Sequence, residues 1–200
     1  MLNTQVKYIH TPHNDVNCFE YLLAVSPAIE VDQKVLLEKE WFYNSFQHQA
    51  GLVTKPHIAI AGFMAKEMLE ETLIRWIQKI CNVQKHFSVS LNNYSGIPAH
   101  TIYLRVQDPL PFRILTNQLK MVDSFIQSNN CPPVNLITAP HLVIADRLPE
   151  HIYNAAIYEF AARSFYESFE VSTLTFLKRK DRQKQYELVN TFTLPAHSFL

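Results

Sequence analysis

The chain has 200 residues, of which 48% are hydrophobic, and this is enough for one well-buried core in a single domain over residues 1–200. Eighteen basic and eighteen acidic side chains give a formal charge of zero, which excludes the broad electrostatic attraction behind non-specific nucleic-acid binding. Any phosphate recognition must therefore be local. The three cysteines are odd in number and widely spaced, which argues against a disulfide framework.

Hydrophobic patterning in the first half of the chain predicts alternating strands and helices. The polar stretch over residues 1–17 is expected to be poorly ordered, and it lacks the features of a secretory signal. No apolar run approaches the roughly 18 residues that span a bilayer, so we expect a cytoplasmic protein without a membrane segment. The elements predicted next are a strand over 18–27, a helix over 31–47, a strand over 56–61 closed by Gly62, a helix over 65–80 and a half-buried strand over 86–94.

The second half repeats this order of elements. Its pattern predicts a strand over 100–107, a helix over 111–128, a strand over 140–146, a helix over 149–166 and a closing hairpin made of 169–180 and 186–194. The repetition predicts an α+β fold of two duplicated lobes, in which two antiparallel sheets face a central cleft and the helices lie outside. With three glycines in the chain, a glycine-rich phosphate loop is disfavoured.

Two short segments carry the repetition in their residues. "TKPHIAIAGF" (54–63) and "TAPHLVIADR" (138–147) share five of ten residues, and each has a Pro-His pair that leads into an apolar run. Because alternate side chains of a strand point to opposite faces, the two histidines should lie opposite the helix-facing residues. The residues expected toward the helices are Ile58, Ile60, Leu142 and Ile144; those expected on the other face are His57, Ala59, Ala61, His141, Val143 and Ala145.

A pair of histidines on one face suits phosphodiester chemistry without a metal. A neutral imidazole removes a proton from the nucleophile, and a protonated imidazole gives one to the leaving oxygen. The structural alternative is that each histidine only begins a strand and hydrogen-bonds to nearby backbone. The paired context of His57 and His141 favours the functional interpretation.

The two Pro-His strands, the order of the elements between them and the closing hairpin resemble the 2H phosphoesterase superfamily. The resemblance is strongest to its branch of 2′-5′ RNA ligase-like and cyclic nucleotide phosphodiesterase proteins, and it covers about residues 19 to 194. That superfamily is named for two H-x-[ST] motifs on duplicated lobes, in which the histidines act as acid and base and the hydroxyls hold the phosphate. The resemblance implies that His57 and His141 are the catalytic pair and that neither a metal nor another cofactor is needed.

The sequence departs from this pattern at both hydroxyl positions, which are occupied by Ala59 and Val143. Loss of one donor to a developing oxyanion typically lowers the rate by about 10²- to 10³-fold. Thr54 and Thr138 are also repeated, but they precede the histidines by an odd number of residues. An odd offset places them on the opposite face of an ideal strand, so we do not expect them to replace the lost hydroxyls.

Other side chains are candidates for ligand contacts, although each type is more often part of a surface or a core. The charged candidates are Lys55, Arg105 and Arg147, and the aromatic ones are Phe63, Tyr103 and Tyr186. The basic run over 178–184 is interpreted as a solvated hairpin tip. The "HTPH" segment over 10–13 lacks acidic or thiol partners, so we expect no metal site there.

Two functions from different classes remain open at the level of sequence. In the first, the protein is a metal-independent phosphoesterase that acts on a 2′,3′-cyclic or 2′-5′-linked nucleotide or an RNA end. In the second, it is a non-catalytic protein that binds a small phosphorylated ligand or an RNA end on the same face. Retention of both histidines favours the first function, and loss of both hydroxyls favours the second.

Overall fold

The computed structural model describes residues 17–49, 55–181 and 184–196. The first half of the chain forms β1 (Cys18–Val25), α1 (Ile29–Phe46), β2 (Ile58–Lys66), the single turn η2 (Glu67–Leu69), α2 (Glu70–Cys81) and β3 (Phe87–Ile97). The second half forms β4 (Thr101–Val106), α3 (Leu110–Gln118), α4 (Lys120–Ser128), β5 (Asn135–Leu136), β6 (His141–Ala145), α5 (Glu150–Ala161), β7 (Tyr166–Val171), β8 (Thr173–Arg179) and β9 (Glu187–Thr193). The predicted α+β class and the repeated order of elements are confirmed.

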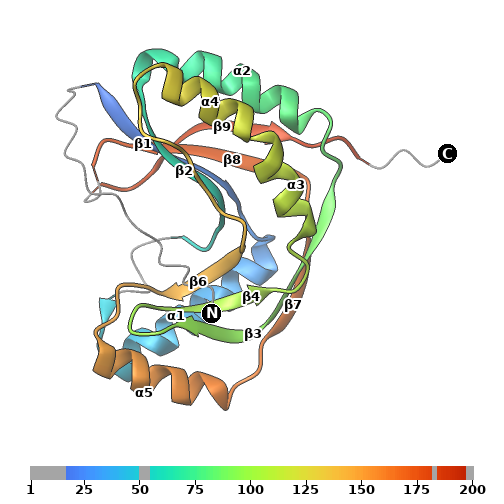
Figure 1. Cartoon of the computed structure of the whole chain (residues 1–200). Helices are drawn as coiled ribbons and strands as arrows, with labels where there is room; N and C mark the ends of the chain where they lie inside the picture. The colour runs from blue at the N-terminus through green and yellow to red at the C-terminus, as the bar shows by residue number, and fades with distance from the viewer. Residues whose placement is uncertain (1–16, 50–54, 182–183, 197–200) are drawn as a thin grey trace, which may run out of the picture.

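The described strands form two antiparallel units that are joined into one nine-stranded sheet. One unit contains β1, β2, β8 and β9, and the other contains β3, β4, β6 and β7, while the short β5 pairs with β2. The two units meet where β2 pairs with β6, through the single residue pair Ile58 and Leu142. Figure 1 shows them as the upper and lower parts of one strongly curved sheet.

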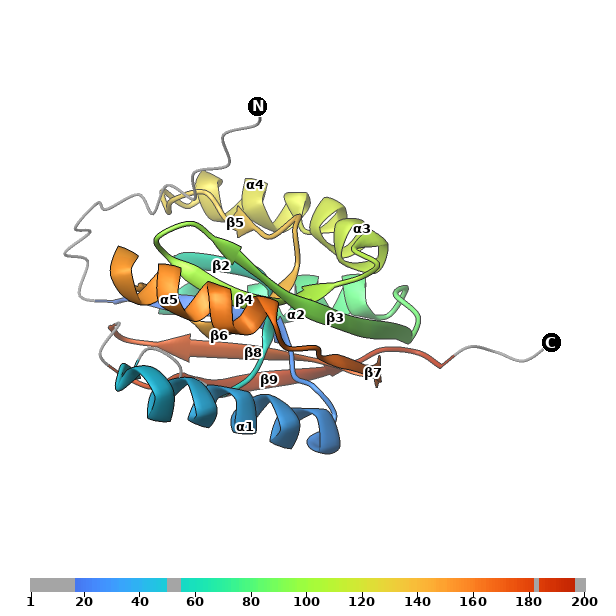
Figure 2. The same ribbon diagram turned by 90° about the horizontal axis from the view of Figure 1, so that it is seen from below.

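The helices lie on the outer sides of the two units, as the sequence predicts. Helix α2 packs against β9 and α4, whereas α1 and α5 pack against strands of the other unit and against each other. Figure 2 views the molecule from below and shows α1 and α5 running across the view, on the side of the molecule that lies at the bottom of Figure 1. Among the described residues, no helix is both long and apolar enough to span a bilayer.

A β-bulge occurs at the same place in both Pro-His strands. In β2 the register with β1 shifts so that Ile60 is the extra residue, and in β6 the register with β4 shifts so that Ile144 is the extra residue. Both bulges lie three residues after the histidine. Because a bulge reverses the alternation beyond it, Ala61 and Ala145 turn into the core, where they are 1% and 0% exposed. The expectation that these alanines lie on the histidine face was wrong.

Three other boundaries differ from the sequence prediction. Strand β2 does not end at Gly62 but continues to Lys66, and the helix expected over 111–128 divides at Leu119 into α3 and α4. The segment expected as one strand over 169–180 divides at Ser172. Its first part, β7, pairs with β3, while its second part, β8, pairs with β1 and β9 in the other unit. Apolar alternation alone does not show which sheet a strand joins.

Helix α1 buries a lysine within its apolar stripe. Its buried residues are Val31, Val35, Lys39 and Phe42, which follow the helical period, and Lys39 is only 2% exposed. Burial lowers the pKa of Lys39 to about 8, although the nearby carboxylates of Asp146 and Asp32 oppose the shift. At neutral pH this buried amine is therefore still mainly charged.

The depressed pKa of Lys39 predicts a pH-dependent stability. Between pH 8 and 10.5 the folded protein releases the Lys39 proton while the unfolded chain keeps it, so the free energy of unfolding rises with pH in this window. Relative to Lys39→Met, the wild type should gain on the order of 3 kcal/mol from pH 7 to pH 10.5. Urea unfolding of both proteins across this range measures the difference between their free energies of unfolding. A difference that does not change with pH would show that the pKa of Lys39 is not lowered by folding.

Candidate active site

The pairing of β2 with β6 places both histidines on one face of the sheet. Ile58 and Leu142 are each 0% exposed, because they point into the core on the helix side. Their sequence neighbours must point the other way. In an antiparallel pair, the residues that flank the paired ones face each other crosswise, which puts Ala59 beside His141 and His57 beside Val143. All four are half-buried on what we call the histidine face.

The two imidazoles are held by the same hydrogen bond. Nδ1 of His57 lies 2.9 Å from the carbonyl oxygen of Lys55, and Nδ1 of His141 lies 2.9 Å from that of Ala139. A carbonyl oxygen only accepts, so Nδ1 carries the hydrogen in both rings. Nε2 is then the basic nitrogen of each neutral ring. The backbone bond of the structural alternative is present, and it fixes the tautomer that acid–base chemistry needs.

Both histidines lie in surroundings that disfavour the charged form. Burial lowers the pKa of His57, the bond to the Lys55 carbonyl raises it, and the charges of Lys39, Arg179 and His141 lower it. Burial also lowers the pKa of His141, and the bond to Ala139 opposes that shift. The effect of His141 on His57 shows that the two rings are within electrostatic reach.

Two of the candidate contacts from the sequence adjoin His141. Tyr103 pairs with Val143 across the strands, and its ring centroid lies 4.6 Å from that of His141. Arg105 pairs directly with His141, and its Nε donates to the carbonyl oxygen of Asn92 at 3.1 Å. An aromatic ring and a guanidinium therefore border the second histidine on the same face.

The two residues at the expected hydroxyl positions, Ala59 and Val143, both lie on the histidine face. Ala59 is opposite Ala24 of β1 in the register, and Val143 is opposite Tyr103 of β4. The nearest hydroxyl in the row of Ala59 and Ala24 belongs to Thr175 of β8, whose Oγ1 donates to the carbonyl oxygen of Ala24 at 3.2 Å. Thr138 is exposed, and Thr54 lies outside the described residues.

Three other candidate contacts have different surroundings. Phe63 is 5% exposed and stacks on Tyr21 with centroids 5.6 Å apart, because the bulge at Ile60 turns it into the core. The Arg147 side chain is 71% exposed and its Nε lies 3.2 Å from an oxygen of Asp146. Lys55 is exposed, and it is its carbonyl that contacts His57.

Sequence reasoning missed two cations that act on His57. Arg179 binds Glu20 with two hydrogen bonds of 2.8 and 2.9 Å, and its guanidinium lies 4.3 Å from the centroid of the Tyr186 ring. Lys39 is buried on α1, and its charge also lowers the pKa of His57. The sequence predicts Arg179 only as part of a solvated basic run, and it offers no signal for Lys39 beyond its place in the helical stripe of α1.

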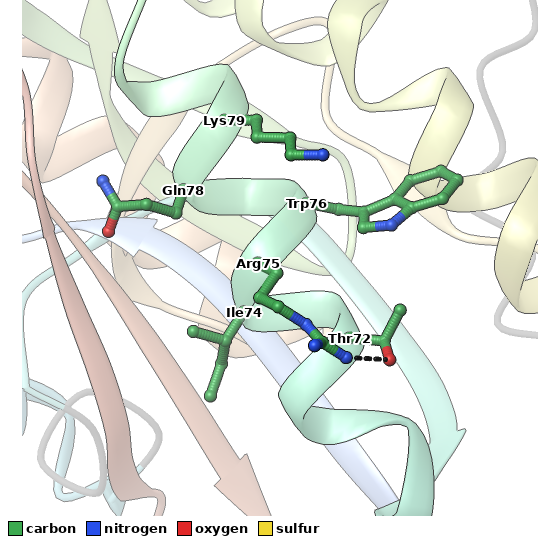
Figure 3. A pocket seen from close by; sticks show the side chains of 6 residues that line it. All are labelled: Thr72, Ile74, Arg75, Trp76, Gln78 and Lys79. Carbon is green, nitrogen blue, oxygen red and sulfur yellow. Dashed lines mark hydrogen bonds between the residues drawn. The ribbon is translucent and has the colours of Figure 1, made fainter.

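A surface hollow of about 490 Å³ lies elsewhere, along α2. Figure 3 shows the residues that line it, which are Thr72, Ile74, Arg75, Trp76, Gln78 and Lys79. All of them belong to one helix on the outer side of the sheet, so the hollow lacks the convergent groups from several elements that mark a reactive site. We therefore place the candidate active site at the two histidines. Within the described ranges, no group of three or more His, Cys, Asp or Glu residues is arranged to hold a metal.

Comparison with solved structures gives the fold independently. The protein TT0787 of Thermus thermophilus matches with a TM-score of 0.65 and 14% identity, over 90% of this chain and 100% of that one. LigT of Escherichia coli, complexed with phosphate, matches with a TM-score of 0.64 and 13% identity, over 89% and 98%. The MHV ns2 PDE domain matches with a TM-score of 0.52 and 14% identity, over 80% and 99%.

The chain has the 2H phosphoesterase fold. No family model and no curated protein matches the sequence. The identities of 13–17% to LigT show how far a sequence can diverge within this 2H phosphoesterase fold.

The hydrogen bonds of the histidines predict their titration. Both neutral rings should carry the hydrogen on Nδ1, and both should titrate at lower pH than in the unfolded chain because burial disfavours the imidazolium. Nitrogen-15 chemical shifts of the two rings, in buffer and in concentrated urea, measure both properties. A neutral ring with the hydrogen on Nε2 would show that the backbone bond is not formed.

Proposed function

We propose that the protein is a metal-independent phosphoesterase of the 2H type that acts on a phosphodiester of a small nucleotide or an RNA end. The observation that carries the proposal is that His57 and His141 share one face and one tautomer, each with Nε2 as the basic nitrogen. Solved complexes of LigT with 3′-AMP, phosphate and ATP support a small phosphorylated ligand.

The chemistry follows from two imidazoles in different protonation states. The neutral ring takes a proton from the attacking water, whose oxygen bonds to phosphorus. The protonated ring gives its proton to the leaving oxygen as the bond from phosphorus to that oxygen breaks. The two rings thus exchange states in one turnover, and proton transfer through solvent restores them. Tyr103 and Arg105 border the same face and are proposed to contact the ligand beside His141.

The loss of hydroxyls at Ala59 and Val143 favours a second candidate, which is a protein that binds a phosphorylated ligand without turning it over. Without two oxyanion donors the chemical step should be much slower than with them. Two buried strand residues and two backbone bonds nevertheless orient both imidazoles, and this supports slow catalysis as the first function.

A pH profile tests the acid–base pair. Hydrolysis of 2′,3′-cyclic nucleotides, 2′-5′-linked dinucleotides or ADP-ribose-derived phosphates should follow a bell-shaped curve, because one imidazole must be neutral and the other charged. Burial lowers the pKa of both rings, so the curve should lie toward the acidic side of neutrality. Replacement of either His57 or His141 by alanine should lower kcat by at least about 10²-fold.

The same assay separates the two candidates. Turnover that survives in both His57→Ala and His141→Ala would remove the pair from the mechanism. Turnover abolished by EDTA and restored by a metal would show different chemistry. Binding of 3′-AMP without any turnover by the wild type would support the non-catalytic candidate.

Restoring the hydroxyls should increase phosphate binding or turnover. In Ala59→Thr/Val143→Thr both hydroxyls would lie two residues after a histidine, on the histidine face. Threonine suits strand positions, so the fold should tolerate both changes. We expect a gain of at least about tenfold in cyclic-phosphate turnover or phosphate affinity.

Two controls make this gain specific. Met64→Thr adds a hydroxyl on the same strand beyond the bulge and should give no gain. The double variant combined with His57→Ala should lose the gain in turnover. A folded double variant that improves neither binding nor turnover would show that positions 59 and 143 do not contact a phosphate and that the histidine face binds another kind of ligand.

A further inference from the structure

The strand register gives the two units of the sheet matching positions beside each histidine. Leu104 of β4 pairs with Leu142, just as Val25 of β1 pairs with Ile58. In both strands the register shifts at the same distance before this pair, because of the two bulges. The residues that flank Leu104 therefore occupy the same places on the histidine face as the residues that flank Val25.

The side chains at these matching positions are unlike. Tyr103 and Arg105 occupy them on β4, whereas Ala24 and Ser26 occupy them on β1. Arg105 pairs directly with His141 in the register. An aromatic ring and a cation therefore border the histidine face on the β4 side, while a methyl group and a hydroxyl take the same places on the β1 side.

The backbone of β3 holds the side chain of Arg105. Its Nε donates to the carbonyl oxygen of Asn92 at 3.1 Å. Asn92 lies in an irregularity of the register between β3 and β4, where the next residue, Asn93, has a left-handed backbone with a φ of 55°. The N–H and the side-chain oxygen of Asn93 bind the backbone of Phe165 at 2.8 and 3.0 Å. These bonds fix the bulge that presents the carbonyl to Arg105.

The terminal nitrogens of Arg105 are open to a ligand. Among the described residues they have no hydrogen-bond partner, since the bond of Nε to β3 is the one that the side chain makes. Arg163 and Arg179 differ, because each binds both oxygens of a carboxylate, those of Glu38 and Glu20. The Arg105 guanidinium is therefore oriented by a neutral carbonyl and keeps its full charge and its planar fork of donors.

The position of this fork separates it from the space between the two imidazoles. Strand β4 lies between β3 and β6 in the sheet, and the fork is bound to β3, on the side of β4 away from His141. Neighbouring strands are about 4.8 Å apart, so the fork lies roughly 5 to 10 Å across the sheet from the strand of His141. The 3′- and 5′-phosphates of one nucleotide are separated by a comparable distance.

We propose that Arg105 forms a subsite for a second phosphate group of the ligand, so that the protein prefers a nucleotide or RNA end with two phosphates to one with a single phosphate. This inference rests on the proposed function for the place of the first phosphate, at the histidines. Guanidinium binds phosphate through two parallel charge-assisted hydrogen bonds. Because the chain has a formal charge of zero, the preference has to come from this local fork.

Binding of two nucleotides tests the subsite without any need for turnover. The wild type should bind adenosine 3′,5′-bisphosphate about tenfold or more tightly than 3′-AMP, because hydrogen bonds to a charged group are worth at least this much. Arg105→Gln should weaken binding of the bisphosphate far more than binding of 3′-AMP and so remove the preference. Calorimetry of both proteins with both nucleotides gives the four Kd values. Equal affinity of the wild type for the two nucleotides, or binding of neither, would overturn the proposal.

A matched variant controls for general charge. Arg113→Gln removes an exposed cation from α3 and should leave the preference of the wild type intact. A loss of preference as large as that of Arg105→Gln would show a general effect of charge, and the proposal would be wrong. Equal weakening of both nucleotides by Arg105→Gln would place Arg105 on the same phosphate as the histidines, which also contradicts a second subsite.

Turnover separates this proposal from the proposed function. If the wild type hydrolyses no cyclic phosphate, the proposed catalysis fails while the binding preference still decides the subsite. If it does hydrolyse them, Arg105→Gln should raise KM for 5′-phosphorylated 2′,3′-cyclic AMP much more than KM for 2′,3′-cyclic AMP. A loss in kcat of the same size for both substrates, with no difference in KM, would show that Arg105 acts on the reacting phosphate and would refute the second subsite.

Discussion

The site depends on one contact between the two halves of the sheet, the pairing of Ile58 with Leu142. Both side chains are fully buried, and the strands that carry them pair with each other at this single position. Burial of two large aliphatic side chains is worth several kcal/mol, so the core fixes which way both strands face. The residues next to Ile58 and Leu142 must point to the opposite face, because side chains alternate along a strand. Apolar packing therefore places both histidines on that face.

Each of the two imidazoles is hydrogen-bonded to a backbone carbonyl oxygen. These carbonyl oxygens fix both imidazoles, and alanine and valine occupy the two positions at which the family resemblance implies hydroxyls. Lys39 on α1 and Arg179 on β8 carry positive charges that lower the pKa of His57. Under the proposed function, such a site would keep its proton-transfer groups and bind the phosphate less tightly, which would give slow turnover or ligand binding without turnover.

The sequence predicted the parts of the fold that a local pattern encodes. The duplicated Pro-His strands indicated the fold and placed His57 and His141 together, because strand alternation is a short-range property. The bulges were missed since they arise from pairing with β1 and β4, and they explain why Phe63 lies in the core rather than on the histidine face. Lys39 could not be assigned, because a lysine in a helical stripe shows its burial only once the neighbouring strand is known.

Titration with 3′-AMP, followed through the signals of both imidazoles, tests whether one small ligand binds both histidines on one face. We expect the signals of His57 and His141 to shift together along one binding curve with one Kd, and either single His→Gln variant to weaken that binding. Shifts confined to one ring, two separate curves, or binding that leaves both rings unaffected while the ligand occupies another surface would contradict it.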